Sequence, residues 1–239
     1  MSAKGTTPPA AQNEEQAARW VRGMFGRVAP RYDLLNHLLS FNRDRAWRRR
    51  TVERLQTALA APGARALDLC CGTGDLALEL AESPAWVVAS DFCHPMLTAA
   101  GAKGCPRLFE ADALTLPLAS ESFDVVTVAF GFRNFANYRR GLDEMRRILR
   151  PGGTLAILEF TTPPKALFRA GYNFYSRHVL PRLGGMLSGA PDAYAYLPES
   201  VRKFPAAPEL AASMREAGLS GVEFEYLTFG VVALHLGRR

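Results

Sequence analysis

Hydrophobic and polar positions change their spacing several times along the middle of the chain, and each change predicts a new element. Short runs rich in Ala, Leu, Val and Phe predict strands that are buried on both faces of a parallel sheet. These predicted strands cover residues 66–69, 86–90, 107–111, 122–130 and 154–160. Between them lie helical patterns that begin near residues 75, 94 and 138. Strands that alternate with helices predict an α/β fold with helices on both faces of the sheet.

The two ends of the chain depart from this alternation. Residues 14–60 carry apolar and aromatic positions in a helical pattern that is interrupted at Pro30. Residues 221–227 and 228–236 predict a closing antiparallel hairpin. The sequence therefore predicts a mostly parallel sheet of seven strands, with a helical N-terminal region and an antiparallel pair at the C-terminus.

The region before the closing hairpin mixes helical and turn-forming patterns. Residues 165–190 predict an irregular helix with aromatic and basic side chains, turn-forming residues dominate 184–208, and a last helix is expected over 208–217. We expect residues 1–13 to form a disordered tail and residues 14–239 to form a single domain. Within this domain we expect a helical lid over residues 14–60 and a substrate-covering insertion over residues 161–205.

Composition and charge limit the classes of function. A chain of 239 residues that is 48% hydrophobic can form one large domain with an ample core. No stretch reaches the ~20 apolar residues of a membrane span, and the first residues lack the apolar core of a signal peptide, so we expect a cytoplasmic protein. The net charge of +6 suits a nucleic acid, an anionic membrane surface or an acidic ligand, or only solvated helix faces. Basic residues gather at Arg43, Arg45, Arg48, Arg49 and Arg50, and again at Arg169, Arg177, His178 and Arg182.

A glycine-paired turn after the first predicted strand carries the strongest chemical signal. Gly72 and Gly74 flank Thr73, and a helical pattern begins directly afterwards. Glycines permit positive φ and close approach of a ligand, while a helix N-terminus offers free N–H groups to a carboxylate or phosphate. The same turn fits G-x-G-x-x-A, a variant of the dinucleotide fingerprint. The turn alone therefore leaves several nucleotide cofactors open.

Acidic residues at the ends of the next two strands strengthen the cofactor interpretation. Asp91 ends the second predicted strand, 17 residues after Gly74, where a carboxylate accepts hydrogen bonds from both ribose hydroxyls. Asp112 and Ala113 follow the third predicted strand, where an acceptor meets an adenine amino group. The glycine turn and these acids together predict a nucleotide site.

The loop after the fourth predicted strand carries Arg133 and Asn134. In open α/β sheets ligands bind at the carboxyl ends of the strands, so both side chains are candidates for substrate chemistry. The four cysteines, even Cys93 beside His94, match no common zinc spacing, and we expect reduced thiols and no metal site.

Several sequence blocks resemble the demethylmenaquinone and ubiquinone-biosynthesis C-methyltransferases, a family of class I methyltransferases that use S-adenosylmethionine (SAM). The specific blocks are MFGRVAPRYDLLNHLLSFNRDRAWRR at 24–49, FGFRN at 130–134 and AYAYLPESVRKFP at 193–205. The block RPGGTLAILEF at 150–160 and the glycine turn are shared more widely among methyltransferases. The resemblance covers nearly the whole chain after the tail.

Two positions depart from this pattern. Asn42 stands where many relatives have Gly, and since Asn tolerates the left-handed conformation we expect the turn to survive. Ala129 stands where some relatives have a Ser that contacts the cofactor, so that contact must be absent or made by the backbone.

The resemblance implies a Rossmann-like class I methyltransferase fold and SAM-dependent methylation of a ring carbon of a prenylated quinol, in menaquinone biosynthesis, ubiquinone biosynthesis or both. The residues expected to bind SAM are Asp68, Gly72, Thr73, Gly74, Asp91, Asp112 and Ala113. Arg133 stays protonated in proteins, so we expect it to stabilise the quinolate oxygen while Asn134 orients the ring. The candidate proton acceptors are Tyr32, Asp33, Tyr172, His178 and a bound water.

Partners and rival functions follow from the same residues. The aromatic stretch 168–187 is a candidate channel for the prenyl tail, and its arginines are candidates for contact with anionic headgroups at the inner membrane face. The sequence also allows a homodimer. A nucleic-acid partner is not expected, because no recognition module accompanies the catalytic domain. The rivals are an NAD(P)-dependent oxidoreductase, a methyltransferase for another aromatic or lipid-like acceptor, and a non-catalytic SAM-binding protein.

Overall fold

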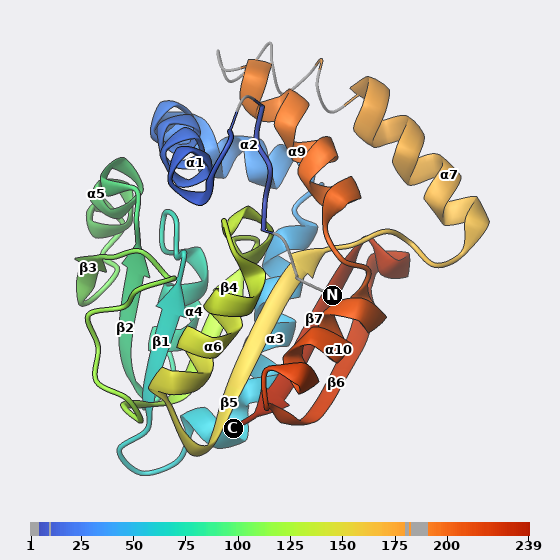
Figure 1. Cartoon of the computed structure of the whole chain (residues 1–239). Helices are drawn as coiled ribbons and strands as arrows, with labels where there is room; N and C mark the ends of the chain where they lie inside the picture. The colour runs from blue at the N-terminus through green and yellow to red at the C-terminus, as the bar shows by residue number, and fades with distance from the viewer. Residues whose placement is uncertain (1–4, 10, 180–181, 183–190) are drawn as a thin grey trace.

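The computed structural model describes residues 5–9, 11–179, 182 and 191–239, and these form a seven-stranded sheet with helices on both faces (Figure 1). The strand order is β3-β2-β1-β4-β5-β7-β6, with β1 to β5 parallel and β7 antiparallel to both of its neighbours. The strands are β1 (Arg65–Leu69), β2 (Trp86–Asp91), β3 (Leu108–Glu110), β4 (Phe123–Ala129), β5 (Leu149–Phe160), β6 (Ser220–Leu227) and β7 (Val232–Arg238). The predicted fold class, including the antiparallel pair, is confirmed.

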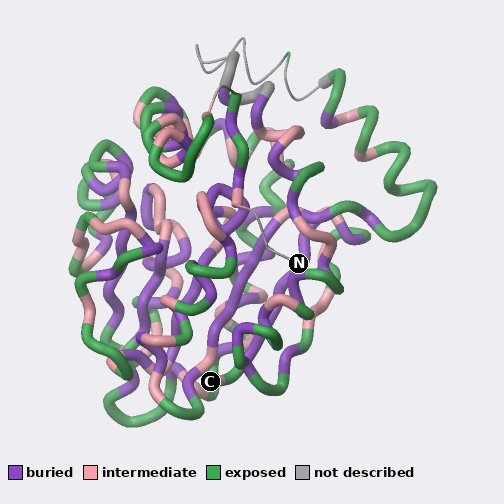
Figure 2. The backbone as a smooth tube through the Cα atoms, viewed as in Figure 1, coloured by how far each residue is buried: buried purple, intermediate pink, exposed green. Residues whose placement is uncertain are grey.

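The helices cover the sheet in two layers. The described helices are α1 (Glu14–Val28), α2 (Tyr32–Leu39), α3 (Arg43–Leu59), α4 (Asp75–Ala81), α5 (His94–Ala102), α6 (Tyr138–Ile148), α7 (Ala166–Phe174), α9 (Pro191–Lys203) and α10 (Ala207–Glu216). Helices α6 and α10 pack on one face, and α3, α4 and α5 pack on the other. Figure 2 shows the buried interior following the strands.

Alternation within each strand builds both halves of the core. On β4, Val126 and Val128 face the α6 layer, while Val125 faces the α3 layer, because successive side chains of a strand point to opposite faces. Leu142 of α6 and Leu55 of α3 are fully buried against these two faces. The near-continuous apolar runs in the sequence are therefore strands with two buried faces, as predicted.

The N-terminal helical region divides at two places. A 3-10 turn, Ala29–Arg31, contains Pro30 and separates α1 from α2, as the sequence predicted. The second break precedes α3, where Asn42 adopts the left-handed conformation with φ of 58°. The expectation that Asn42 supports this turn is thus confirmed. Helices α1 and α2 lie over the carboxyl ends of the central strands (Figure 1).

The prediction of irregular structure over 184–208 is wrong for its second half, where α9 is a helix of 13 residues. Pro198 lies inside the helix, but the buried side chains Tyr196 and Val201 pack against the domain. Tertiary packing therefore overrides the local helix-breaking tendency. Residues 180–181 and 183–190 of the predicted irregular helix lie outside the described residues.

Part of the predicted tail has defined contacts with the domain. The N–H of Thr6 donates to the carbonyl of Phe135 over 2.7 Å, and the Thr6 side chain is buried. Gly5 lies so close to Ala136 that a Cβ would overlap its carbonyl group. The division into tail, lid and insertion stays a prediction, but residues 5 and 6 are packed rather than free. No helix in the described ranges is long and apolar enough to cross a membrane.

Candidate functional site

A pocket opens at the carboxyl ends of β1, β2 and β4, beneath α1 and α2. It encloses about 730 Å³, with the open space at its mouth included. The predicted site residues that line it are Tyr32, Gly72, Asp91, Asp112, Ala113 and Asn134. The other predicted site residues, Asp33, Asp68, Thr73, Gly74 and Arg133, lie outside this lining. The structure therefore divides the predicted site into residues that line the pocket and residues that lie behind or beside this lining.

The two glycines of the turn have different reasons to be glycine. Gly72 has φ of 56° and lines the pocket, and the ring of Tyr32 lies above it, 3.7 Å from the place of a Cβ. Gly74 has φ of 86° and packs against α5, where a Cβ would lie 3.2 Å or less from Ala100 and Cys105. Gly72 leaves the backbone open to the pocket, whereas Gly74 lets α5 pack close to the turn.

Asp91 is held at the pocket by the backbone around it. Its two carboxylate oxygens accept hydrogen bonds of 2.9 Å from the N–H groups of Gly72 and Cys93. Burial raises the pKa of Asp91 despite these donors. Asp112 is oriented similarly, because its Oδ1 accepts from the N–H of Leu114 over 2.9 Å. Backbone hydrogen bonds therefore orient both predicted carboxylates in the pocket wall.

Asp68 is buried behind the turn. Its Oδ1 accepts a hydrogen bond from the Thr127 hydroxyl over 2.6 Å, while its Oδ2 has no partner in the described part of the chain. Burial raises the pKa of Asp68 to about 7. A buried carboxylate oxygen without a partner is costly, so this atom is a candidate for contact with a cationic ligand group.

Thr73 and Asp33 belong to a polar cluster on the outer side of the turn. The Thr73 hydroxyl donates to the carboxylate of Asp33, and Lys103 Nζ lies 2.9 Å from Asp33 Oδ2. Lys103 also pairs with Asp75 at the start of α4. The cluster joins α2, the glycine turn, α4 and α5. Sequence reasoning missed Lys103, since a lone lysine at a helix end carries no local signal.

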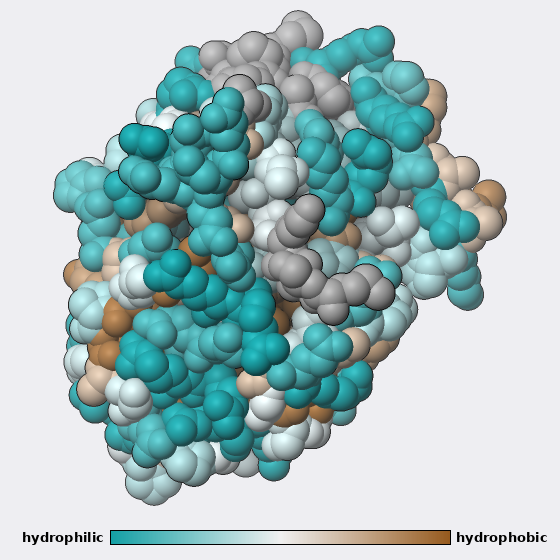
Figure 3. Space-filling view, in the orientation of Figure 1, coloured by the Kyte–Doolittle hydropathy of each residue, from teal (hydrophilic) through white to brown (hydrophobic). Residues whose placement is uncertain are grey.

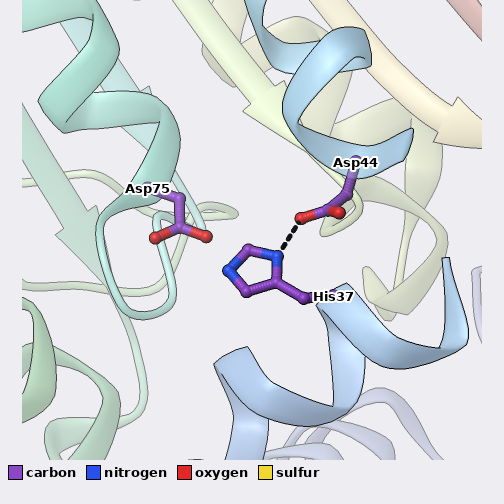
Figure 4. A group of neighbouring side chains, drawn as sticks. All are labelled: His37, Asp44 and Asp75. Carbon is purple, nitrogen blue, oxygen red and sulfur yellow. Dashed lines mark hydrogen bonds and ion pairs between the residues drawn. The ribbon is translucent and has the colours of Figure 1, made fainter. Parts of the chain in front are cut away.

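A second polar network lies beside this cluster, with His37, Asp44 and Asp75 at its centre (Figure 4). His37 Nδ1 lies 2.7 Å from Asp44 Oδ2. One ring nitrogen of His37 and one carboxylate oxygen each of Asp44 and Asp75 lie within 4.8 Å of one another, so these atoms could together hold a metal ion. Arg48 Nη2 lies 2.7 Å from Asp44 and 3.1 Å from Asp75. The guanidinium already balances the two carboxylates, so we describe the group as an ion-pair network between α2, α3 and α4.

Arg133 and Asn134 lie in a 3-10 turn, Phe132–Asn134, directly after β4. The turn packs closely against the end of β1 at Gly131, where a Cβ would overlap the side chain of Cys70. The Arg133 guanidinium is buried and pairs with Glu159 of β5 over 2.9 Å, and the N–H of Arg133 donates to the same carboxylate over 3.1 Å. Sequence reasoning missed Glu159, although an acid within the apolar run TLAILEF was an available signal.

Two buried donors of this turn lack partners. Arg133 Nε and Asn134 Nδ2 have no hydrogen-bond partner within the described ranges, and both side chains are less than a tenth exposed. Neither atom can accept a hydrogen bond, so both require an acceptor. Tyr196 of α9, also missed, donates from its hydroxyl to Asn134 Oδ1 over 3.0 Å. The site thus offers unpaired donors beside a pocket that can hold a nucleotide.

Comparison with known proteins gives this geometry a context. A model described as the ubiE/COQ5 methyltransferase family matches residues 11–239. A demethylmenaquinone methyltransferase of Thermus thermophilus is 53% identical over 223 residues, which cover 90% of this chain and 100% of the relative. A demethylmenaquinone methyltransferase of Deinococcus radiodurans is 47% identical over 237 residues and 96% of each chain.

Solved structures resemble the chain in fold. A SAM-dependent methyltransferase of Thermotoga maritima, a possible histamine N-methyltransferase, superposes with a TM-score of 0.62 at 20% identity over 90% of this chain and 98% of its own. The [4+2]-cyclase SpnF superposes with a TM-score of 0.68 at 17% identity over 99% of this chain and 98% of its own. Since a cyclase and a methyltransferase share the fold, the reaction must be argued from the site and the sequence relatives.

Proposed function

Because the chain belongs to the ubiE/COQ5 methyltransferase family, we propose that it transfers a methyl group from SAM to a ring carbon of demethylmenaquinol. Demethylmenaquinone methyltransferases at 46–53% identity support this acceptor. The observation that carries the proposal is the pair of unpartnered buried donors, Arg133 Nε and Asn134 Nδ2, beside the pocket. A methoxy-benzoquinol of ubiquinone biosynthesis is the second candidate acceptor, because the resemblance of the blocks at 24–49, 130–134 and 193–205 covers both kinds of enzyme.

The pocket fits SAM on three observations. Gly72 leaves room for the methionine part, Asp91 offers a carboxylate to the ribose hydroxyls, and Asp112 with the backbone of Ala113 meets the adenine. The unpaired Oδ2 of Asp68 suits the methionine ammonium group, directly or through water. SAM supplies an electrophilic methyl group when it is bound. The residues around it hold it in line with the acceptor carbon, and positioning of this kind is a large share of the catalysis.

Arg133 and Asn134 act on the acceptor. A quinol hydroxyl, like a tyrosine, ionises near pH ~10, and loss of its proton makes the neighbouring ring carbon nucleophilic. Arg133 Nε and Asn134 Nδ2 donate hydrogen bonds to the resulting quinolate oxygen and so favour its formation. The new carbon–carbon bond forms as the carbon–sulfur bond breaks, and the ring carbon then loses its proton.

The candidate proton acceptors are not equally suited. Burial raises the pKa of Tyr32, and it raises that of Tyr172 to about 12, so both hydroxyls stay protonated near neutral pH. Asp33 is paired with Lys103 outside the pocket lining. His178 is exposed and, like Asp33, lies outside the pocket lining. We therefore propose that Tyr32 orients the ring, while a bound water accepts the proton of the quinol hydroxyl.

We also propose that the protein rests on the membrane that carries the prenylated quinol. Exposed apolar side chains gather on α2, on α7 and on the 3-10 turn Thr228–Gly230. These residues, the α2–α7 surface, are Leu34, Leu38, Phe41, Leu167, Phe168, Phe174 and Phe229. Phe168 of α7 stacks on Phe229 of the 3-10 turn at a centroid distance of 4.4 Å, and Phe41 lies 6.0 Å from Tyr175, which directly follows α7.

Helix α7 is the centre of this surface. None of its residues is fully buried, and Figure 2 shows it exposed along most of its length, with Tyr172 half-buried. Figure 3 shows an apolar patch at the right edge, where Figure 1 places α7. Arg169, Arg177 and His178 flank the apolar side chains and suit anionic headgroups. Contact with the inner membrane face would bring the pocket to its water-insoluble acceptor. The predicted homodimer stays a prediction.

The test of the proposed function is a product assay. Purified protein is mixed with methyl-labelled SAM and short-chain demethylmenaquinone under reducing conditions, with a demethylated methoxy-benzoquinol in a parallel reaction. We expect label on the naphthoquinol ring by mass spectrometry. Label on both acceptors would make the enzyme bifunctional, and label on neither, with SAM still bound, would contradict the proposal. Binding of NADH instead of SAM, followed by fluorescence, would favour the oxidoreductase.

Variants then test the role of Arg133. Arg133→Lys keeps the charge but loses the Nε donor, and we expect kcat to fall about 10- to 1000-fold with SAM affinity unchanged. Arg133→Gln combined with Glu159→Gln avoids leaving a buried carboxylate unpaired and should show a similar loss. Arg139→Gln on the exposed side of α6 is the matched control. Full activity of Arg133→Lys would remove the quinolate role.

A further inference from the structure

A short hydrogen-bond chain joins the N-terminal segment, α9 and the pocket. The Tyr196 hydroxyl lies 3.0 Å from Asn134 Oδ1 and 2.6 Å from Thr6 Oγ1. All three side chains are at least nine-tenths buried, and 190 residues of sequence separate Thr6 from Tyr196. Tyr196 lies outside the pocket lining, whereas Asn134 is part of it.

The chain has one direction. A phenol carries a single proton, and Tyr196 gives it to Asn134 Oδ1, because that oxygen can only accept. Thr6 Oγ1 must then donate to the Tyr196 oxygen. With its Oδ1 engaged, Asn134 presents its Nδ2 donor, which has no partner in the part of the chain that the structure describes. The neighbouring hydroxyl therefore decides which end of the amide is free to meet a ligand.

We propose that Tyr196 is a positioning residue that holds the Asn134 amide as a hydrogen-bond donor toward the acceptor oxygen, and that Thr6 locks Tyr196 in this role. This proposal rests on the proposed function, and it adds the contact that keeps the Nδ2 donor of Asn134 directed at the acceptor oxygen. An amide free to turn over would present its carbonyl oxygen, which repels a quinolate. Methylation would then lose part of the stabilisation of the anion, while SAM binding would not change.

The segment that carries Thr6 is held in register at two further points. The N–H of Thr6 donates to the Phe135 carbonyl, one residue after Asn134, over 2.7 Å. Gly5 packs directly on the carbonyl group of Ala136, where no side chain fits. Trp20 of α1 lies against the Tyr196 ring at a centroid distance of 4.9 Å. The hydroxyl of Tyr196 is therefore held by Thr6 and Asn134, and its ring is held by Trp20.

The test compares Tyr196→Phe with Tyr226→Phe, which removes a hydroxyl from a partly exposed ring on β6. We expect kcat for the labelled quinol to fall about 10- to 100-fold in Tyr196→Phe, with an unchanged Kd for SAM by calorimetry. The acidic limb of the kcat profile should move to higher pH, because a weaker donor stabilises the quinolate less. A melting temperature close to that of the wild type would show that the fold is intact.

Thr6 supplies a graded check. Thr6→Val removes the hydroxyl at constant volume and should lower kcat in the same direction, whereas Thr6→Ser should restore it. Unchanged kcat and pH profile in Tyr196→Phe would overturn the proposal. So would a loss of kcat that is matched by a loss of SAM affinity, since that pattern indicates general structural damage.

A binding readout separates this proposal from the proposed function. The ionisation of 1-naphthol, followed by absorbance, reports whether the SAM-loaded protein stabilises an aromatic oxyanion even if no quinol is methylated. We expect the wild type to lower the pKa of bound 1-naphthol, and Tyr196→Phe to lower it less. Equal pKa values for 1-naphthol in both proteins would contradict the positioning role whatever the product assay shows.

Discussion

At the scale of single residues, buried charges in and around the pocket are stabilised to three different degrees. Asp91 accepts two backbone hydrogen bonds, Arg133 is paired with Glu159, and Asp68 keeps one oxygen unpaired. An unpartnered buried carboxylate is expensive to ionise, which is why the pKa of Asp68 rises to about 7. Of the three residues, Asp68 would therefore be stabilised most in its ionised form by a cationic ligand group.

This difference predicts a pH dependence of SAM binding. An ammonium group favours the charged form of Asp68, so binding lowers its pKa, and SAM affinity should rise between pH 6 and 7.5. Asp68→Asn should bind SAM more weakly at pH 7.5 and show a flatter profile. Calorimetry in buffers of different ionisation enthalpy would detect the proton released on binding. An equal slope in Asp68→Asn and in the control Asp143→Asn, an exposed acid of α6, would contradict the contact.

At the scale of elements, α7 and α9 both contain poor helix formers but differ in how far they are buried. Helix α9 contains Pro198 and is nevertheless a helix, because its apolar side packs on the domain. Helix α7 contains Gly171 and Asn173, which are poor helix formers, and it buries none of its residues. An amphipathic helix without a covering element is typical of a surface that another phase or partner covers.

We expect α7 to govern binding to lipid vesicles. Leu167→Ser together with Phe174→Ser should lower partitioning onto vesicles with anionic lipid at least about tenfold, because each large apolar side chain contributes roughly 1.5–3 kcal/mol when it leaves water. Binding should also weaken as salt rises, since ionic strength screens the basic side chains. The control is Tyr226→Ser on β6. Unchanged partitioning in a sedimentation assay would count against the α2–α7 surface as a membrane contact.

At the scale of the whole molecule, the closing strands couple stability to pH through one histidine. His235 of β7 is buried, its Nε2 lies 2.9 Å from the Ala207 carbonyl, and its ring stacks on Phe224. Burial lowers the pKa of His235 from 6.5 to about 4. The unfolded chain therefore binds a proton here between pH 6.5 and 4 that the folded chain does not.

The free energy of unfolding should accordingly fall as the pH drops from 6.5 toward 4, and this contribution should be complete above pH 6.5. His235→Gln keeps a donor toward Ala207 and removes the titration, so its unfolding free energy should depend less on pH in this window. Urea titrations at pH 7 and 5 would measure the difference. His94→Gln, at an exposed position, should retain the wild-type dependence.

The features of the fold and of the site that the sequence predicts are those that depend on a few neighbouring residues. The strands, the glycine turn, Asp91 and Asp112 come from apolar runs and short spacings, and the structure places these acids in the pocket wall. The left-handed Asn42 also follows from local chemistry. The second half of 184–208 was predicted wrongly, because turn-forming residues say nothing about the packing that stabilises α9.

The sequence by itself determined the family, the order of the elements and the residue types at the strand ends, because hydrophobic periodicity and motif spacing act over a few neighbouring residues. Only the tertiary structure decided which of those residues line the pocket and which lie outside its lining. It set Asp33 against Lys103, 70 residues away, Arg133 against Glu159, and Thr6 against Tyr196. Such partners are fixed by the packing of whole elements, and no local pattern encodes that packing.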